Sequence, residues 1–313
     1  MTPRHQLDLT ALRILDGGLA TELERAGSDL SSPLWSGEIL RTRPELIIAV
    51  HRSYLEAGAD CLLTASYQVS ALALREAGLP PDAAPALMRR SVALAEQARQ
   101  QYRASARQAG LVPRPIWIAG SLGAYGAALH NGAEFHGHYD ISPTALTAFH
   151  AERIAAMEPT AADFLAFETV PRLDEAAAIL EALQSFPQLA ACISFTCRDD
   201  AHTGHGEPIE DCARLLDRHP QILAIGINCT APRFALPLVR RIRALCGLPI
   251  ALYPNSGETW VAKTRGWTGR SDPADFGRLA CAWRAAAAGH IWVGGCCRTT
   301  PAHIRAVAAV LRA

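Results

Sequence analysis

The sequence lacks the features that mark several classes of protein. Lys plus Arg and Asp plus Glu number 30 each, so neither charge is in excess. Proteins that bind nucleic acid or anionic membranes usually carry a basic patch. No run reaches the roughly 20 apolar residues that cross a bilayer, and residues 1–13 lack the apolar core of a signal peptide. We therefore expect a cytoplasmic monomer or small homo-oligomer that binds small molecules, with no nucleic-acid or membrane partner.

The sequence also lacks any CxxC pair, although it contains nine cysteines. In the cytoplasm thiols stay reduced. The cysteines are therefore expected to be core residues, metal ligands or nucleophiles rather than a disulfide framework. Five of them fall within predicted strands or helices and are expected in the core: Cys61, Cys192, Cys212, Cys246 and Cys281.

Half of the 313 residues are apolar, which is enough for one large core. Short apolar runs that end at polar or glycine residues are typical of buried strands. Eight such runs occur, at Leu12–Leu15, Cys61–Thr64, Ile116–Ala119, Phe164–Phe167, Ala191–Phe195, Ile222–Ile227, Ile250–Tyr253 and Ile291–Val293. Segments of helical character separate them, among them Pro44–Ala57, Ala86–Ala109, Arg172–Ser185, Ile209–Arg218, Ala235–Leu245, Pro273–Ala288 and Pro301–Leu311.

Strands that alternate with helices pair in parallel, and eight such units close into a barrel. We therefore predict an α/β protein in which residues 1–313 form a single (β/α)8 barrel domain. A doubly wound open sheet is the competing arrangement. A further helix is expected after Ser142, which can cap it, because Pro143 suits a first turn and Leu146, Phe149 and Met157 then share one face.

Polar and glycine residues collect directly after the predicted strands. In a barrel the carboxyl ends of the strands form one face, and this face holds the active site. Eight separate segments would therefore converge on one pocket, which indicates an enzyme. They are residues 16–18, 66–67, 120–123, 168–169, 196–197, 228–229, 254–256 and 294–297.

Cys229 follows the sixth predicted strand, and Cys296 and Cys297 follow the eighth. One strand separates these two in a barrel, so the thiols could share an ion. Three thiolates with one open tetrahedral position are typical of a catalytic zinc site. Soft thiolate ligands also favour zinc over magnesium or calcium. A thiol substrate at the open position would be held as a thiolate at neutral pH.

Neighbouring residues on a regular strand point to opposite faces. Cys296 and Cys297 can therefore bind one ion only if the chain bends, which Gly294 and Gly295 permit. In the alternative interpretation one of the two cysteines lies in the core and the other is exposed. The spacing alone leaves both interpretations open.

Two carboxylates end strands on the same face. Asp16 and Glu168 could bind the ammonium of an amino-acid substrate, and Gly17 and Gly18 could offer backbone amides to its carboxylate. Asp16 could instead cap the amides of the following turn. Glu168 closes an apolar strand, and a buried acid in that position needs a partner, which favours a functional role.

Aromatic residues lie in or near the loops after the strands, where their faces would attract an onium cation such as a sulfonium methyl donor. They are Trp35, Tyr67, Tyr125, Phe135 and Trp260. Histidines in two polar loops have spacings that could bind a metal, but no cysteine or carboxylate cluster accompanies them in the sequence. We therefore expect solvated histidines at His136, His138, His202 and His205.

These residues together resemble the homocysteine S-methyltransferase family from about Leu15 to Arg298. The motifs that carry the resemblance are Leu15-Asp16-Gly17-Gly18 with Thr21-Glu22, Asp60 to Tyr67, Gly120 to Gly126, Phe167-Glu168-Thr169-Val170-Pro171, Gly226-Ile227-Asn228-Cys229, Tyr253-Pro254-Asn255 and Gly294-Gly295-Cys296-Cys297-Arg298. The chain departs from the family's pattern at Phe135, where a tyrosine is typical.

The resemblance implies a barrel in which Cys229, Cys296 and Cys297 hold Zn²⁺ and, with Glu168, carry catalysis. It implies that homocysteine binds near Asp16, Gly17, Gly18 and Glu168, and we assign further substrate contacts to Trp35, Tyr67 and Asn255. Methyl transfer would give methionine. The chain is similar to the short members that use S-methylmethionine or S-adenosylmethionine, which implies a sulfonium donor. Betaine as donor or selenohomocysteine as acceptor is an alternative, and zinc-dependent hydrolysis is a weaker one.

Overall fold

The structure is a computed structural model that describes residues 7–261 and 266–313. Its central sheet has eight parallel strands in the order β1-β10-β7-β6-β5-β4-β3-β2. The strands are β1 (Arg13–Ile14), β2 (Cys61–Leu63), β3 (Trp117–Gly123), β4 (Phe164–Val170), β5 (Ala191–Phe195), β6 (Ile222–Asn228), β7 (Ile250–Tyr253) and β10 (Ile291–Val293). All eight predicted strands are therefore confirmed.

The first and last strands of this order join, which closes the sheet. Leu15 and Cys61 form a parallel bridge. The amide of Asp16 donates to the carbonyl of Cys61 at 3.0 Å, and the amide of Asp60 donates to the carbonyl of Ile14 at 2.6 Å. The sheet is thus a (β/α)8 barrel, and the doubly wound arrangement is wrong for this chain.

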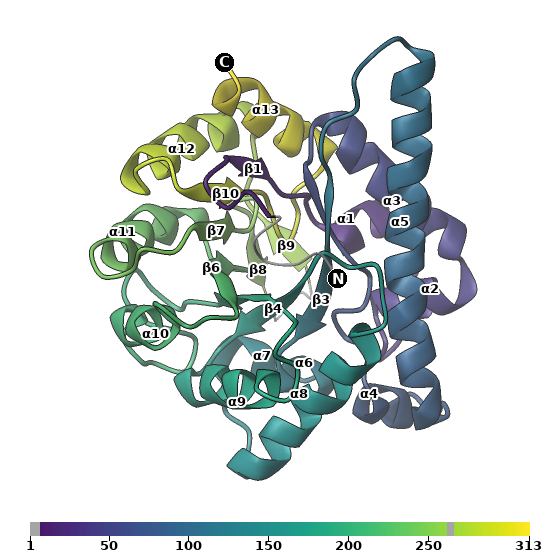
Figure 1. The fold of residues 1–313 in the computed structure, drawn as a ribbon, viewed down its shortest axis with the longest axis vertical. Coiled ribbons are helices and arrows are strands. Elements are labelled where there is room, and N and C mark those ends of the chain that lie inside the picture. The colour runs from purple at the N-terminus through teal and green to yellow at the C-terminus, as the bar shows by residue number, and fades with distance from the viewer. Residues whose placement is uncertain (1–6, 262–265) are drawn as a thin grey trace.

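A ring of helices surrounds the strands (Figure 1). Its members are α3 (Pro44–Ala57), α5 (Ala84–Gln108), α8 (Pro143–Met157), α9 (Leu173–Leu183), α10 (Ile209–Leu216), α11 (Pro232–Arg243), α12 (Pro273–Ala286) and α13 (Pro301–Leu311). Every predicted helix is present, with ends that shift by a few residues at most. Shorter elements, which the sequence did not indicate, occupy the connections: α1 (Leu19–Arg25), α2 (Ser36–Thr42), α4 (Ala71–Glu76), the 3-10 turn η2 (Pro81–Ala83), α6 (Tyr125–Ala128) and α7 (Ala133–His136).

Helix α8 begins as its sequence predicts. The hydroxyl of Ser142 accepts a hydrogen bond from the amide of Ala145 at 3.2 Å, which satisfies one free amide of the first turn. Leu146 and Met157 are buried, and Phe149 packs partly buried against the core. The predicted apolar face is therefore the face that contacts the barrel.

A strand's side chains alternate between the inside of the barrel and the surrounding helices. On β4, Phe164 and Ala166 pack in the inner cluster, whereas Leu165 and Phe167 pack with the helices. The same alternation directs Glu168, two residues beyond Ala166, into the barrel at its carboxyl end. The register of one strand thus places an acid over an apolar floor.

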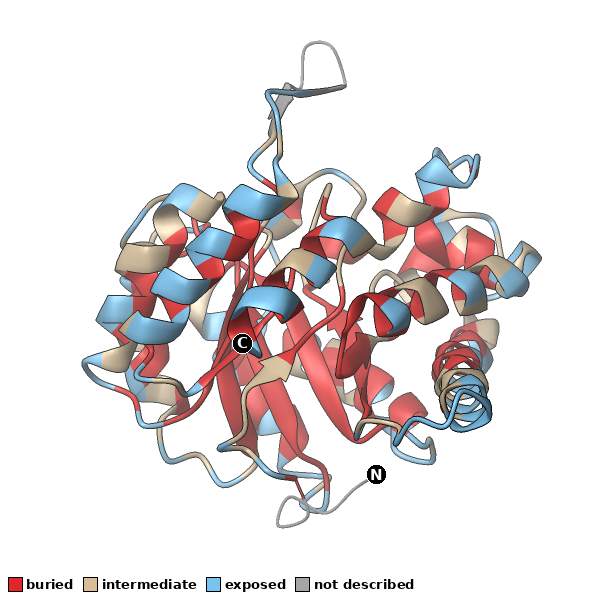
Figure 2. Ribbon diagram, turned by 90° about the horizontal axis from the view of Figure 1, so that it is seen from above, coloured by how far each residue is buried: buried red, intermediate tan, exposed pale blue. Residues whose placement is uncertain are grey.

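That floor is aromatic. The rings of Trp117, Phe164 and Trp292 lie within 6.0 Å of one another, centroid to centroid, and meet edge to face or at a tilt. The guanidinium of Arg13 covers Trp117 at 4.0 Å. In Figure 2 most of the strand residues are buried, while the helices expose their outer sides. Aromatic side chains therefore fill the amino-terminal half of the barrel.

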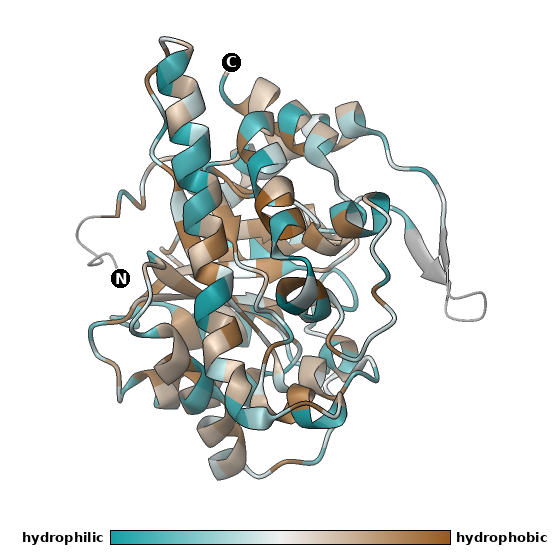
Figure 3. Ribbon diagram, turned by 90° about the vertical axis from the view of Figure 1, so that its right-hand side faces the viewer, coloured by the Kyte–Doolittle hydropathy of each residue, from teal (hydrophilic) through white to brown (hydrophobic). Residues whose placement is uncertain are grey.

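Helix α5 is the longest helix and packs along α3 on the outside of the barrel. Hydrophilic residues cover much of its outward surface (Figure 3). In residues 7–261 and 266–313, no helix combines the length and the apolar character needed to cross a lipid bilayer.

A two-stranded antiparallel hairpin, β8 (Thr259–Val261) and β9 (Gly266–Thr268), follows β7 and was not predicted. Trp260, one of the aromatic residues considered for the donor, belongs to β8. Its side chain lies outside the described residues, so its predicted role stays untested.

Candidate active site at the carboxyl end of the barrel

The three cysteines of the predicted metal site converge at the carboxyl end of the barrel. The sulfur of Cys229 lies 2.6 Å from that of Cys296 and 3.7 Å from that of Cys297. All three sulfurs lie within 4.8 Å of one another. In the described part of the chain this is the one group of His, Cys, Asp and Glu residues that could hold a metal ion.

The backbone at Cys229 is strained in a way that aims the sulfur at its partners. Cys229 has a φ of 48°, and Thr169 at the end of β4 has a φ of 59°. Such positive values are unfavourable for residues with a side chain and cluster at functional sites. Asn228 links the end of β6 to the end of β4. Its side-chain oxygen accepts from the backbone amide of Thr169 at 2.8 Å, and its side-chain nitrogen donates to the Thr169 hydroxyl at 2.9 Å.

Cys296 and Cys297 lie in a turn beyond β10, so the strand alternation that would separate them does not apply. The prediction that both reach one site is supported, but the reason given for the two glycines is wrong. Neither Gly294 nor Gly295 has a positive φ. They are glycines for lack of space, because a Cβ on Gly294 would lie 2.6 Å from the Asp16 carbonyl oxygen and one on Gly295 2.4 Å from the Thr299 hydroxyl.

The three thiols cannot all ionise by themselves. Hydrogen bonds from Cys229 and then Cys296 hold the pKa of Cys297 well below its usual range. The hydrogen bond to Cys296, the one to Cys297 and burial raise the pKa of Cys229 well above its usual range. One thiolate is therefore stable in the cluster, and a full set of three needs a cation.

The donor set fits a tetrahedral thiolate site for a soft metal. Two sulfurs bound to one zinc ion through bonds of about 2.3 Å are about 3.8 Å apart. The separation of 3.7 Å between Cys229 and Cys297 matches this value. The separation of 2.6 Å between the sulfurs of Cys229 and Cys296 is shorter than this value.

Glu168 lies beside the cluster, at the end of β4, and is 8 % exposed. Its Oε2 accepts a short hydrogen bond from the hydroxyl of Ser121. Burial nevertheless raises the pKa of Glu168 to about 7. A carboxylate in this state favours a cationic ligand, because the cation would offset the cost of its burial.

Asp16 is the second buried carboxylate, and burial raises its pKa well above the usual range. The charge of Glu168 acts on it in the same direction, so the two acids are close. Asp16 Oδ2 accepts from the amide of Leu63 in β2 at 3.0 Å, not from the following turn as the capping interpretation required. A substrate ammonium between Asp16 and Glu168 would stabilise both charges.

The two glycines after Asp16 differ in what they can offer a ligand. The Gly18 amide already donates to the Thr299 hydroxyl at 3.1 Å. The Gly17 amide has no acceptor among the residues that the structure describes. A Cβ on Gly17 would lie 2.7 Å from the Tyr54 ring. Gly17 is therefore the better candidate for a carboxylate contact, and Gly18 is needed for the turn.

Of the five aromatic residues, Trp35 and Tyr67 form a pair at the site, with ring centroids 6.3 Å apart. The charges of Glu134 and Cys229, after burial, raise the pKa of Tyr67, which places its hydroxyl near the cysteines. Tyr125 instead packs against Tyr139 and Phe149, 5.3 and 5.2 Å away. The structure thus brings only part of the predicted aromatic set to the cysteines.

The side chain of Phe135, another of the five aromatic residues, is 48 % exposed.

Asn255 follows β7, and the next residue, Ser256, donates its amide to the Cys297 carbonyl at 3.0 Å. The Asn255 side-chain oxygen is buried and, within residues 7–261 and 266–313, has no hydrogen-bond partner. An unpaired buried acceptor of this kind is expected where a ligand donates, which supports the substrate contact assigned to Asn255.

Sequence reasoning missed a buried arginine that holds loops near the site in place. Arg153 of α8 is buried and donates to the carbonyls of Tyr67 at 2.8 Å, Gly123 at 2.5 Å and Val69 at 3.3 Å. It thereby ties the loops after β2 and β3 to the helix ring. No local pattern indicates such a role, because Arg153 lies more than 80 residues from two of the loop carbonyls it binds.

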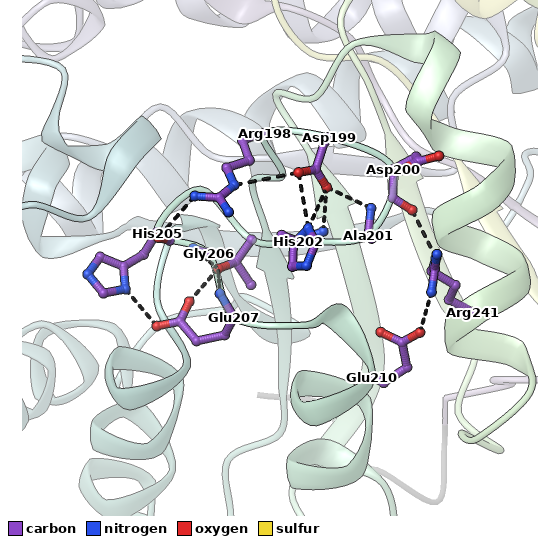
Figure 4. A network of polar contacts seen from close by, with 11 residues as sticks. Arg198, Asp199, Asp200, Ala201, His202, His205, Gly206, Glu207, Glu210 and Arg241 are labelled. Carbon is purple, nitrogen blue, oxygen red and sulfur yellow. Dashed lines mark hydrogen bonds and ion pairs between the residues drawn. The ribbon is translucent and has the colours of Figure 1, made fainter.

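The loop after β5 has more internal partners than the sequence suggested. His202 pairs with Asp199 at 3.0 Å, and His205 pairs with Glu207 at 2.8 Å (Figure 4). Each of these two histidines thus has one carboxylate partner that the sequence did not indicate, while both keep part of their surface in solvent, as expected for loop histidines. Among the five cysteines expected in the core, Cys281 is exposed, and the other four are buried.

The fold and the site together define a (β/α)8 barrel with a cluster of three thiols that could hold a metal ion and two buried acids at its carboxyl end. Residues 13–311 match the profile of the homocysteine S-methyltransferase family. The homocysteine S-methyltransferase YbgG of Bacillus subtilis is 43 % identical over 309 residues, which cover 99 % of this chain and 97 % of that protein.

Solved structures agree with these matches. The metallated form of the homocysteine methyltransferase MmuM from Escherichia coli superposes with a TM-score of 0.84 at 40 % identity and covers 98 % of each chain. The oxidized form of MmuM gives the same TM-score at 41 % identity, with 96 % of each chain covered. The chain therefore belongs to the homocysteine S-methyltransferase family.

Proposed function

We propose that this protein is a zinc-dependent homocysteine S-methyltransferase that uses a sulfonium donor and forms methionine. The observation that carries the proposal is the convergence of Cys229, Cys296 and Cys297 next to two buried acids. The thiols offer a metal three soft ligands, and the acids offer an amino-acid ammonium two charges. Family membership over residues 13–311 supports the same reaction.

Each part of the site has a distinct task in this reaction. Cys229, Cys296 and Cys297 would hold zinc, which when bound lowers the pKa of a thiol substrate so that its sulfur is a thiolate at neutral pH. Asp16 and Glu168 bind the homocysteine ammonium, and the amide of Gly17 binds its carboxylate. These contacts fix the substrate so that its sulfur faces the open side of the cluster.

The charge of the site favours a cationic donor over a neutral one. Three thiols, Asp16, Glu168 and Glu134 make the region acidic. The guanidinium of Arg298, the cation beside Cys297, is already paired with Glu258 at 3.1 Å. The faces of Trp35 and Tyr67 offer additional attraction to an onium group. S-methylmethionine and S-adenosylmethionine both fit this chemistry.

The proposal extends to the setting of the enzyme. We take residues 1–313 as a single barrel domain, because one ring of helices surrounds one barrel. The three thiols must stay reduced to bind a metal, which favours the cytoplasm. The substrates are small molecules, and the protein acts as a monomer or a small homo-oligomer.

The test is a set of single serine substitutions at the three cysteines, with Cys281→Ser as the matched control because Cys281 is exposed and does not belong to the cluster. We expect Cys229→Ser, Cys296→Ser and Cys297→Ser each to lose stoichiometric zinc and methionine formation while circular dichroism stays unchanged. Cys281→Ser should retain both. Full zinc content and activity in any one of the three would refute the role of that cysteine.

A further inference from the structure

Glu134 is a partly buried acid near the carboxyl end of the barrel, and the binding of zinc and homocysteine described above gives it no role. It belongs to α7, in the long connection between β3 and α8. Its Oε2 atom is buried and has no hydrogen-bond partner among the residues that the structure describes. Leaving a charged acceptor buried and unpaired destabilises a fold, so a ligand that supplies a positive charge is the expected partner.

The backbone around Glu134 is held tightly, which makes the position of the carboxylate a built feature. A Cβ on Gly126 would lie 2.4 Å from the amide nitrogen of Glu134, and one on Gly204 would lie 2.2 Å from the carbonyl oxygen of Phe135. Both glycines are therefore required for the loops to approach α7. Gly204 belongs to the connection after β5, in which His202 bonds to Asp199 and His205 bonds to Glu207 (Figure 4).

A second anchor fixes the ends of the same connection. Glu175 of α9 is fully buried and accepts from the amide of Tyr125 at 2.6 Å and from the hydroxyl of Tyr139. His150 of α8 lies 3.0 Å from the same carboxylate. The segment that carries Glu134 is thus tied down before it, after it and along its length.

Glu134 faces the cysteine cluster without belonging to it. After burial, the charge of Cys297 raises the pKa of Glu134, and the charge of Glu134 raises the pKa of Tyr67. The carboxylate is therefore close enough to both Cys297 and Tyr67 for their charges to interact with it. The described group that could hold a metal contains the three cysteines alone, so Glu134 is not a fourth ligand in this geometry.

We propose that Glu134 binds the methyl donor by pairing its carboxylate with the sulfonium centre, an inference that rests on the proposed function. The methyl carbon must lie about 3 to 3.5 Å from the attacking sulfur. The sulfonium is therefore the donor's cationic group that lies nearest the cluster, whereas the donor's own ammonium is several bonds away. Asp16 and Glu168 serve the ammonium of homocysteine.

The pairing lasts only as long as the donor is charged. In the transfer, a bond forms between the homocysteine thiolate sulfur and the methyl carbon, and the bond between that carbon and the sulfonium sulfur breaks. The electron pair of the broken bond stays on the donor sulfur. One negative and one positive sulfur thus become two neutral thioethers, so Glu134 binds the substrate donor and not its demethylated product.

This role predicts a split between the kinetic constants of Glu134→Gln. Ground-state attraction is lost, so the KM for the donor should rise about 10-fold to 100-fold, while kcat is not lowered because the charge disappears as the methyl moves. The KM for homocysteine and the zinc content should stay unchanged. Glu134→Asp, which retains the charge, should recover part of the donor affinity, and Glu45→Gln on the outer face of α3 is the matched control.

The experiment measures initial rates with the zinc-loaded full chain, with S-methylmethionine and S-adenosylmethionine varied separately at saturating homocysteine. Inhibition by methionine is measured in parallel, because methionine retains the ammonium but has a neutral sulfur. A raised donor KM with an unchanged methionine inhibition constant supports the pairing with the sulfonium.

An unchanged donor KM in Glu134→Gln would overturn the pairing with the sulfonium. A methionine inhibition constant that rises together with the donor KM would also overturn it, as would a loss of kcat together with zinc. Wild-type protein that turns over with neither donor would refute the proposed function itself. Turnover by the wild type, together with kinetic constants that do not change in Glu134→Gln, would overturn the role of Glu134 alone.

Discussion

Glu168→Gln should make the protein more stable at alkaline pH while it weakens homocysteine binding. Glutamine has the shape of glutamate and can still accept from the Ser121 hydroxyl, but it carries no charge. The wild-type carboxyl has a pKa of about 7 in the fold against 4.5 for an ordinary glutamate. The folded state therefore holds on to a proton that the unfolded chain has lost.

The sign and size of the effect follow from this difference. Below pH 4.5 both states are protonated, and the carboxyl imposes no penalty. As the pH rises through 4.5 and then 7, the penalty grows to about 3 kcal/mol, at about 1.4 kcal/mol for each pH unit between the two pKa values. Between pH 5.5 and pH 8.5 the penalty increases by about 2 kcal/mol.

The assay is urea unfolding of the wild type and Glu168→Gln at pH 5.5 and pH 8.5, with the same metal content in both. Subtracting one protein from the other removes titrations that they share, including those of the thiols. We expect the stability of the variant relative to the wild type to increase by about 2 kcal/mol from pH 5.5 to pH 8.5. A difference in stability that does not change with pH would show that the pKa of Glu168 is not raised in the fold and would refute the reasoning.

Three further variants test the framework of the site. Arg153→Met should lower the free energy of unfolding by about 3 kcal/mol or more, because three buried carbonyls lose a charged donor. Urea unfolding measures this change. A loss below about 0.5 kcal/mol would contradict the role of Arg153 in tying these loops to the helices. Gly226→Ala should cost about 2 kcal/mol, because its Cβ would lie within 1.9 Å of the Ser194 hydroxyl. Adding Ser194→Gly should recover part of that loss, and purely additive effects would argue against the contact. Glu168→Ala should weaken homocysteine binding in calorimetry at unchanged zinc content, and an unaltered affinity would count against its substrate role.

The sequence predicted the barrel because each strand is encoded locally. Runs such as Ile222–Ile227 and Ala191–Phe195 are apolar, rich in β-branched or aromatic residues, and end at polar residues. Once eight strands are parallel and closed, the residues after them must meet at one end. The convergence of Cys229 with Cys296 and Cys297 was therefore predictable from topology, and the inward direction of Glu168 follows from the alternation along β4.

What the sequence could not predict depends on contacts between distant segments. Glu134 and Arg153 acquire their roles from loops that fold against them, and neither position carries a motif of its own. Gly294 and Gly295 are required by the Asp16 carbonyl and the Thr299 side chain, not by their own backbone angles. The pairs His202–Asp199 and His205–Glu207 were likewise missed. In the last case the residues are close in sequence, so a turn-by-turn reading of the loop could have found them.

The most direct test of the account is methionine formation from homocysteine by the zinc-loaded protein, with S-methylmethionine, S-adenosylmethionine and betaine offered separately. The account predicts turnover with a sulfonium donor, its loss on chelation, and its recovery when zinc is returned. Protein that contains one zinc per chain and forms no methionine with any of the three donors would contradict the account.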